Sequence, residues 1–194
     1  MTHFHAQRLE RLEGEWSRRR LLTLGGLAAA AILAPRPVLA HLRRSGISEK
    51  SLAFYNPHTG ESLKTVYWTE GTYVPEALAD INRLCRDYRC DEIIPIDLQL
   101  LDLLFAVHKK LEARQPFHIV SAYRSPATNA MLRQHNRGVA KNSLHIQGKA
   151  VDMRLPGRRI ATVRRVAVSL RQGGVGYYPR SDFVHIDTGE VRYW

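Results

Sequence analysis

The sequence has few of the residues that would indicate a disulfide-rich, repetitive or membrane-embedded protein. Of its 194 residues only two are cysteines and three are methionines, and 8% are aromatic. It shows no repeat with the period of a solenoid and no long low-complexity tract. The longest apolar run, Leu21 to Ala34, is too short for a bilayer span, which needs about 20 apolar residues. The length suits one medium-sized globular domain.

The two cysteines, Cys85 and Cys90, leave two interpretations open. They could form a disulfide in an oxidising compartment. Positions five apart on a continuous helix point to different faces, however, so a bridge would need a break in the chain after Tyr88. A disulfide and two free thiols are therefore both compatible with the sequence. Two cysteines with this spacing are also weak evidence for a metal site.

Acidic residues are scarce relative to basic ones. There are 18 Asp and Glu against 29 Lys and Arg, which gives a formal net charge of +11. This balance favours a polyanionic partner, such as nucleic acid, anionic lipid or an anionic wall polymer. Charge does not choose among these partners, so the compartment must.

The N-terminal segment indicates export. The run Ser17-Arg18-Arg19-Arg20-Leu21-Leu22 is typical of a twin-arginine signal, and the apolar run follows it. Val38-Leu39-Ala40 then resembles a cleavage site. We expect a twin-arginine signal peptide at residues 1–40 and an exported domain at residues 41–194, with an uncleaved anchor as the alternative. In the periplasm the available polyanion is peptidoglycan, whose stem peptides carry carboxylates.

The remaining chain mixes strand and helix patterns without a regular βαβ alternation. We expect strands at 52–56, 63–68, 117–121, 149–155, 174–178 and 183–187. We expect helices at 75–89, 98–113, 125–135 and 160–170, with Asp97 and Ser125 as N-caps. This order predicts an α+β fold.

Three residues in the second half could hold a metal ion. His145 and Asp152 are seven positions apart, and Gly148 between them lets the chain turn back. His185 lies on a late strand that could pair with the strand of Asp152, where Ala150 and Asp152 should share one side. Two imidazoles and a carboxylate suit Zn²⁺ with a fourth position open for water. Each residue alone would more often be structural.

The pattern resembles peptidase family M15, the D-alanyl-D-alanine peptidases, whose zinc fold is shared with the Hedgehog signalling domain. The signature S-x-H-x2-G-x-A-x-D followed by acid-x-x-H is filled by Ser143, His145, Gly148, Ala150, Asp152, Asp182 and His185. Segments 121–129, 138–141 and 173–179 resemble in particular the twin-arginine-exported murein endopeptidases of this family. The likeness runs from about Leu52 to Trp194.

The resemblance implies a zinc domain with a small, mostly antiparallel sheet flanked by helices and one Zn²⁺ per chain, held by His145, Asp152 and His185. It places Arg124 at the active site as an oxyanion donor, where the alternative is a surface salt bridge. Asp182 stands where carboxypeptidase members have glutamate, one methylene longer, so Asp182 is the candidate general base. Asp187 is the alternative base, although a structural hydrogen bond explains it more simply.

Further residues are weaker candidates. Ser121 and Ser143 could hold a ligand or the substrate, and Ser143 could hydrogen-bond within the metal site. Tyr177 or Tyr178 could contact substrate, although an aromatic residue there is more often packing. No G-x-S-x-G element is present, which argues against covalent catalysis.

The sequence therefore predicts a monomeric, periplasmic, zinc-dependent murein endopeptidase that hydrolyses the peptide cross-links of peptidoglycan. It predicts no nucleic-acid partner and no stable membrane span after processing. One alternative is a D,D-carboxypeptidase or dipeptidase acting on wall peptides. Another is a non-catalytic module that binds peptidoglycan and contains zinc only for structure.

Overall fold

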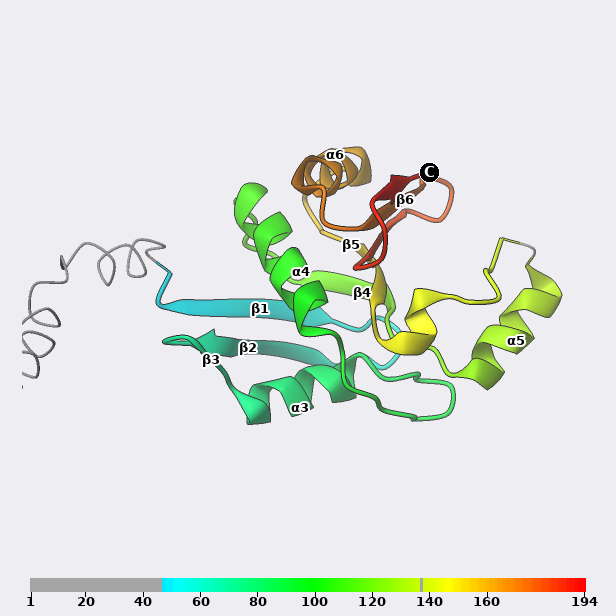
Figure 1. The fold of residues 1–194 in the computed structure, drawn as a ribbon, viewed down its shortest axis with the longest axis horizontal. Helices are drawn as coiled ribbons and strands as arrows, with labels where there is room; N and C mark the ends of the chain where they lie inside the picture. The colour runs from blue at the N-terminus through cyan, green and yellow to red at the C-terminus, as the bar shows by residue number, and fades with distance from the viewer. Residues whose placement is uncertain (1–46, 137) are drawn as a thin grey trace, which may run out of the picture. The chain divides into compact units, whose positions relative to one another are not determined.

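In the computed structural model, one sheet organises the described residues, which are 47–136 and 138–194 (Figure 1). Its eight strands lie in the order β3-β2-β1-β4-β5-β7-β6-β8. Neighbouring strands are antiparallel except for β1–β4 and β6–β8, which are parallel. The strands are β1 (Glu49–Tyr55), β2 (Ser62–Thr69), β3 (Thr72–Tyr73), β4 (Phe117–Ser121), β5 (Ala150–Arg154), β6 (Gly174–Tyr178), β7 (Phe183–Asp187) and β8 (Arg192–Tyr193).

The predicted signal peptide at 1–40 lies outside the described residues. Among the helices that are described, none is both long and apolar enough to cross a bilayer.

Within residues 47–136 and 138–194, four α-helices and one short 3₁₀ turn accompany the sheet. They are α3 (Pro75–Leu84), α4 (Leu98–Lys110), α5 (Pro126–His135), η1 (Leu144–Gln147) and α6 (Ile160–Leu170). The predicted caps are confirmed: the Asp97 side chain accepts a hydrogen bond from the Gln99 N–H, and Ser125 accepts one from the Thr128 N–H. Pro75 and Pro126 occupy first turns, where a missing N–H costs nothing.

Helix α3 ends earlier than the expected 75–89. The chain leaves the helix at Cys85, and Asp87 then bridges to Glu92. The buried Asp87 carboxylate accepts hydrogen bonds from the Ser125 and Arg89 N–H groups. The long-range bond to Ser125 ties this loop to the start of α5.

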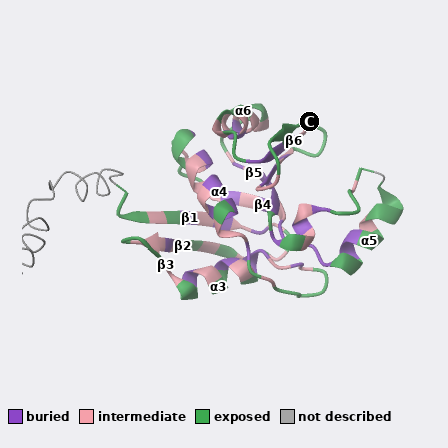
Figure 2. Ribbon diagram, viewed as in Figure 1, coloured by how far each residue is buried: buried purple, intermediate pink, exposed green. Residues whose placement is uncertain are grey.

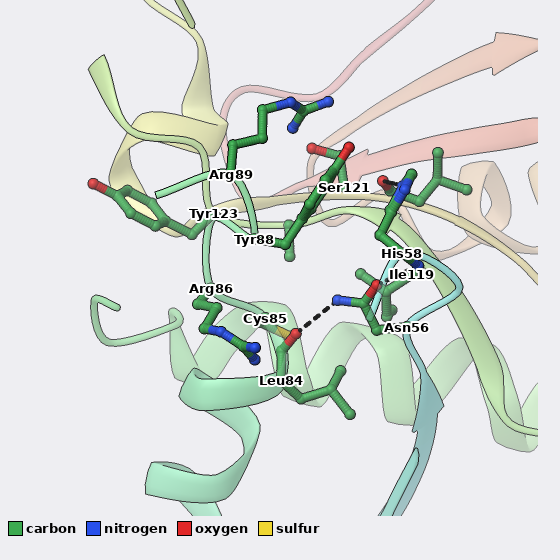
Figure 3. A pocket seen from close by; sticks show the side chains of 12 residues that line it. Asn56, His58, Leu84, Cys85, Arg86, Tyr88, Arg89, Ile119, Ser121 and Tyr123 are labelled. Atoms are coloured by element: carbon green, nitrogen blue, oxygen red, sulfur yellow. Dashed lines mark hydrogen bonds between the residues drawn. The ribbon is translucent and has the colours of Figure 1, made fainter. Parts of the chain in front are cut away.

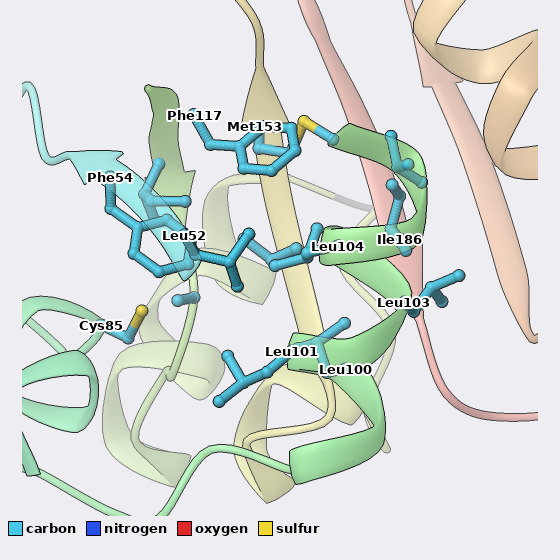
Figure 4. Packing of buried hydrophobic residues seen from close by; sticks show 14 of the residues in the cluster. Leu52, Phe54, Cys85, Leu100, Leu101, Leu103, Leu104, Phe117, Met153 and Ile186 are labelled. Carbon is cyan, nitrogen blue, oxygen red and sulfur yellow. The ribbon is translucent and has the colours of Figure 1, made fainter. Parts of the chain in front are cut away.

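The hydrophobic core lies on one face of the sheet, beneath α4 and α6 (Figures 2 and 4). Alternate strand residues point into it, and helix residues such as Leu101 and Leu104 pack against them. The strand contribution consists of Leu52, Phe54, Tyr67, Phe117, Ile119, Val151, Met153, Val175, Val184 and Ile186. Because side chains alternate along a strand, the residues between these point to the other face. That second face carries Asp152 and His185.

Both cysteines are free thiols in the described structure, so the disulfide interpretation is not realised. Cys85 is buried at the end of α3, and burial raises the pKa of its thiol to about 12. Cys90 is exposed. The chain does turn between them, but at Cys85 rather than after Tyr88.

The α+β class is confirmed, and the sheet is mostly antiparallel as expected. The sheet is larger than the small one expected, because the two-residue strands β3 and β8 extend it at both edges. Such short strands lack enough residues to show a period-two pattern. The finer likeness to the Hedgehog domain stays a prediction.

Candidate metal centre

The sheet register and one short turn bring His145, Asp152 and His185 together. Asp152 on β5 lies directly opposite His185 on β7. His145 lies on η1, which ends at Gly148 in the left-handed conformation (φ 66°). A Cβ at Gly148 would come within 2.6 Å of the Pro95 carbonyl oxygen, so the tight return needs glycine. One donor atom from each of the three side chains lies within 4.8 Å of the others.

The two imidazoles are held so that one nitrogen of each faces the shared space. His145 Nδ1 donates to the Ala122 carbonyl at 2.6 Å, which leaves Nε2 directed at the site. His185 Nε2 donates to Asp187 Oδ2 at 2.9 Å, which leaves Nδ1 directed at the site. Metal-binding histidines in proteins are usually anchored in this way, through a carbonyl or carboxylate on the second nitrogen.

The donor set and its spacing fit Zn²⁺. Two donor atoms bound to zinc at 2.0–2.1 Å in a tetrahedral arrangement stand about 3.3 Å apart. His145 Nε2 lies 3.3 Å from His185 Nδ1 and 3.3 Å from Asp152 Oδ2, and His185 Nδ1 lies 2.8 Å from Asp152 Oδ1. The two contacts of Asp152 use different carboxylate oxygens, so the carboxylate would need to rotate for one oxygen to share an ion with both imidazoles. The predicted ligand set is therefore geometrically able to bind a metal.

The charges of the metal-free site favour a carboxylate beside a protonated imidazole. Burial by itself would raise the pKa of Asp152, but the charge of His145 and hydrogen bonds from both imidazoles hold that pKa well below its usual range. Burial opposes protonation of His185, yet its hydrogen bonds to Asp152 and Asp187 raise the pKa of its ring to about 9. Near neutral pH a cation entering the site must therefore displace a proton from His185.

Asp187 anchors the candidate ligand His185, and its position does not suit a general base. Its side chain is 0% exposed. Oδ1 accepts from the Gly174 and Gly189 N–H groups, while Oδ2 accepts from His185. These bonds outweigh burial and lower the pKa of Asp187 to about 2. This geometry agrees with the structural hydrogen bond considered for Asp187. The side chain bonds to the candidate ligand His185 as well as to loop N–H groups.

The two predicted serines lie beside the candidate ligands. Ser121 on β4 pairs with Asp152 across the β4–β5 ladder, and the Arg124 Nη2 lies 3.5 Å from its hydroxyl. Ser143 caps η1, its hydroxyl accepting from the His145 N–H at 3.4 Å. Both serines thus help to place residues of the site.

Arg124 is buried with its guanidinium next to the metal-site carboxylate. Nη2 lies 3.7 Å from Asp152 Oδ2, and Nη1 donates to Asn129 Oδ1 at 3.2 Å. The Asn129 amide in turn donates to the Ala140 and Lys141 carbonyls, so it links Arg124 to the loop after α5. Within the described residues Arg124 Nε has no hydrogen-bond partner, so the protein does not use all the donors of this side chain. The surface salt bridge considered for Arg124 is not what the structure contains.

Asp182 lies in the turn between β6 and β7. It has a left-handed backbone (φ 53°), a conformation that aspartate tolerates better than most residues. Its side chain is 64% exposed, and Oδ2 lies 3.4 Å from Arg154 Nη1. Arg154 follows Asp152 by two positions on β5, so it shares the face of the metal centre. Asp182 is thus at the end of that face, with an exposed carboxylate that contacts Arg154.

Tyr177 points away from the metal centre, which argues against its predicted contact with substrate. It pairs with Val184, whose side chain is in the core, and the Arg164 guanidinium of α6 lies 5.5 Å from its ring centre. The period of two on β6 places its neighbour Tyr178 on the other face. Tyr178 was the second option in the sequence, and only the strand order decides between them.

Three aromatic side chains, those of Tyr178, Phe183 and Trp194, form an aromatic wall beside His185. Tyr178 stacks on Phe183 with ring centres 4.6 Å apart, and Trp194 Nε1 donates to the Tyr178 hydroxyl at 2.9 Å. The Trp194 ring centre lies 5.4 Å from that of His185. The sequence offered no signal for Trp194, since its neighbour on the sheet depends on strand order.

A second wall lies on the β4 side. His58 stacks on Tyr88 at 4.2 Å, and the Arg89 guanidinium covers the Tyr88 ring at 4.3 Å. With Ser121 these residues line a hollow of about 10 Å³, room for about one water molecule (Figure 3).

Together, the mixed sheet and the His-Asp-His group define a candidate mononuclear metal centre with charged and aromatic side chains around it, the arrangement of a metal-dependent hydrolase. The chain belongs to the family described as peptidoglycan L,D-endopeptidase MepK, whose sequence model matches residues 44–194. It is 46% identical to the "Peptidoglycan L,D-endopeptidase MepK" of Escherichia coli K12 over 92% of this chain and 97% of that protein.

Other curated relatives agree. The protein of the same name from Shigella flexneri is also 46% identical, over the same shares of both chains. The "Probable peptidoglycan L,D-endopeptidase MepK" of Haemophilus influenzae is 40% identical over 92% of this chain and 95% of that protein. The predicted membership in the murein endopeptidases of family M15 is thereby confirmed, and this is a family of zinc peptidases.

Proposed function

We propose that this chain is a zinc-dependent murein endopeptidase that hydrolyses peptide cross-links of peptidoglycan. The observation that carries the proposal is the triad His145, Asp152 and His185, whose donor atoms face one point at spacings suited to one zinc ion. Membership in a family of peptidoglycan endopeptidases supplies the substrate class.

The metal would be held by His145 Nε2, Asp152 and His185 Nδ1. Zn²⁺ bound there would polarise the scissile carbonyl and make a water molecule more acidic at neutral pH. The protein holds these donors rigidly, through Ala122 behind one imidazole and Asp187 behind the other. This preorganisation supports a catalytic site rather than a passive one.

Asp182 is proposed as the general base. Its carboxylate would accept a proton from the attacking water at Oδ1 or Oδ2 and pass it to the leaving amine. Two observations support this role. The side chain is exposed, and its contact with Arg154 at 3.4 Å holds it on the face of the metal centre.

Arg124 is proposed to stabilise the negative charge that develops on the scissile carbonyl oxygen. A guanidinium stays charged and offers donors in a fixed fork. Its position 3.7 Å from Asp152 supports the role, and Asn129 sets the direction of the fork. Ser121 contributes through its contact with Arg124.

The names of the relatives specify L,D-endopeptidases. We infer the same bond preference here: cleavage between an L- and a D-configured residue, as in 3→3 cross-links. The flanking walls around Trp194 and Tyr88 would let a strand of substrate pass the metal centre on both sides, which an endopeptidase needs. Arginines on this face, such as Arg89 and Arg154, would bind stem-peptide carboxylates.

We further propose that residues 1–40 direct export by the twin-arginine route and that the domain from residue 41 works in the periplasm. The start of the family match at residue 44 supports this division. The substrate also requires a location at the cell wall.

The decisive experiment is mass spectrometry of muropeptides from purified peptidoglycan that contains both 3→3 and 4→3 cross-links. The zinc-loaded protein should convert 3→3 dimers to monomers. A chelator should abolish the reaction, and added Zn²⁺ should restore it. Release of terminal D-alanine with dimers intact would instead indicate a carboxypeptidase, and bound zinc without any hydrolysis would indicate a binding module.

A further inference from the structure

Two side chains of the edge segment Arg192–Trp194 cross a neighbouring strand to reach the metal centre. In the sheet, β6 lies between β8 and β7. The Arg192 guanidinium nevertheless contacts Asp187 on β7, and the Trp194 ring lies beside His185 on the same strand. Both side chains therefore pass over β6.

Glycines on β6 make this crossing possible. Gly176 pairs with His185, and the Gly174 N–H donates to the Asp187 carboxylate, on the face that carries the metal centre. A Cβ at Gly174 would lie 2.8 Å from Arg192 Nη1, and a Cβ at Gly176 would lie 2.7 Å from the Trp194 ring. Neither separation is compatible with the present packing. The alternation Gly174-x-Gly176 on β6 thus matches the alternation Arg192-x-Trp194.

Arg192 acts on the carboxylate that orients His185. Its Nη2 donates to Asp187 Oδ2 at 2.8 Å and its Nη1 donates to Oδ1 at 3.2 Å, so the contact is bidentate. The same Oδ2 accepts from His185 Nε2. A fork of two parallel bonds fixes both the position and the plane of the carboxylate.

Trp194 restricts the His185 ring from the side. Its backbone is fixed by two bonds to β6, from the Trp194 N–H to the Val175 carbonyl and from the Tyr177 N–H to the Trp194 carbonyl. Its indole is fixed by the bond to Tyr178 and by Arg192, whose guanidinium lies 5.1 Å from the ring. Trp194 is 46% exposed, and its ring covers one side of the imidazole with ring centres 5.4 Å apart.

We propose that Arg192 and Trp194 are positioning residues of the metal centre, which together hold His185 so that Nδ1 faces His145 and Asp152. The inference rests on the metal-binding part of the proposed function. Arg192 acts through Asp187, and Trp194 acts by packing. The site therefore depends on the edge segment Arg192–Trp194, which supplies no ligand itself.

The test is the zinc affinity of the full chain, measured against a chromophoric chelator in the absence of peptidoglycan. Arg192→Ala should weaken zinc binding by about 10- to 100-fold, as loss of a partner behind a metal-binding histidine does, and Trp194→Ala by about 10-fold. Arg192→Lys keeps the charge without the fork and should fall between wild type and Arg192→Ala. Circular dichroism identifies any variant that fails to fold.

Two control variants separate positioning from general loosening. Tyr193→Ala removes an aromatic ring from the same strand on the opposite face, where the hydroxyl of Tyr193 reaches the Val168 carbonyl. Arg165→Ala removes an equal charge from the exposed side of α6. Both should bind zinc like the wild type. Equal weakening by Tyr193→Ala would mean that β8 matters only for stability, and would overturn the proposal.

Gly176, the glycine of β6 beneath the Trp194 ring, gives a sharper test. Gly176→Ala should displace the Trp194 ring and weaken zinc binding about as much as Trp194→Ala does. In a Trp194→Ala background the same glycine change should cost little further affinity, since the ring it would strike is gone. Additive losses would overturn the proposed role of Trp194, as would normal zinc affinity with a raised KM, which would make Trp194 a substrate contact.

Failure of this inference differs from failure of the proposed function. A wild-type chain that binds zinc, with Arg192 and Trp194 variants equal to it, refutes only the positioning role. A wild-type chain that binds no zinc refutes the metal centre and the positioning role together. Zinc binding without peptidoglycan hydrolysis refutes the peptidase but leaves the positioning role standing.

Discussion

Asp152 and His185 lie directly opposite each other on β5 and β7, with Oδ1 of one 2.8 Å from Nδ1 of the other. Residues in register on antiparallel strands point to the same side of the sheet, so the pairing itself puts two donors at one place. The turn η1 then needs to deliver only one more donor, His145 Nε2. A metal centre built on paired strands is more rigid than one built on loops.

Replacement of His145 or Asp152 by alanine should remove zinc and activity together, because two donors leave the metal too weakly bound. Zinc content by elemental analysis and release of muropeptides measure the two effects. His118→Ala is the matched control, since His118 lies on the adjacent strand β4 and contacts Tyr55 rather than the metal centre. Full activity in either ligand variant would refute the ligand assignment.

Asp182→Asn should keep zinc but reduce kcat by about 10²- to 10⁴-fold, the usual contribution of a general base. The amide matches the carboxylate in size, so the turn between β6 and β7 should be unchanged. Ser181→Ala, one position earlier in this turn, serves as control. Near-normal turnover with zinc bound would exclude Asp182 as the base.

Asn129→Ala should reduce kcat/KM by about 10- to 100-fold without loss of zinc, because Arg124 would no longer be aimed at the site. The structural basis is the bond from Arg124 Nη1 to Asn129 Oδ1 and those from the Asn129 amide to the loop after α5. Gln134→Ala on the exposed side of the same helix should have little effect. Equal kinetics in the two variants would show that Arg124 needs no such support.

Asp87 should make stability depend on pH in the acid range. Burial opposes its charge, but hydrogen bonds from Thr128, Ser125 and Arg89 lower the pKa of Asp87 below that of the unfolded chain. A group with a lowered folded pKa stabilises above its unfolded pKa, and this stabilisation disappears as the pH falls through the folded pKa. The wild type should therefore lose the contribution of Asp87 below about pH 4, where the unfolded carboxylate begins to take up protons.

Asp87→Asn should cost about 1–3 kcal/mol of unfolding free energy at pH 7, the loss expected for a buried, charged hydrogen-bond acceptor. Urea unfolding at a series of pH values measures this difference, which should shrink as the pH approaches 3. Asp80→Asn, on the exposed side of α3, is the control and should show no such trend. A difference that is constant from pH 7 to pH 3 would contradict the argument.

The sequence predicted the elements that depend on local rules. The strands at 117–121, 174–178 and 183–187 and the helix that begins after Ser125 have the bounds expected from it. Caps, turn-forming glycines and apolar periods act over a few residues, so they are visible in a single sequence. The three candidate ligands were also visible, through a spaced motif and its family resemblance.

Other features depended on contacts between distant segments. Helix α3 ends at Leu84, and beyond it the Asp87 carboxylate accepts a hydrogen bond from the N–H of Ser125, thirty-eight positions away. The choice between Tyr177 and Tyr178 requires the strand order as well as the period of two. The bond from His185 to Asp187 could have been anticipated, since residues two apart on a strand share a face.

By itself, the sequence predicted the candidate ligands, the local elements and the family, because each shows in short motifs or apolar periods along the chain. Only the tertiary structure decided which groups stand behind those ligands. Arg192 and Trp194 reach His185 and its partner because β8 pairs beside β6 and two glycines leave room above that strand. Such neighbours are fixed by the order of strands in the sheet, a property of the whole packed domain that no short stretch of chain contains.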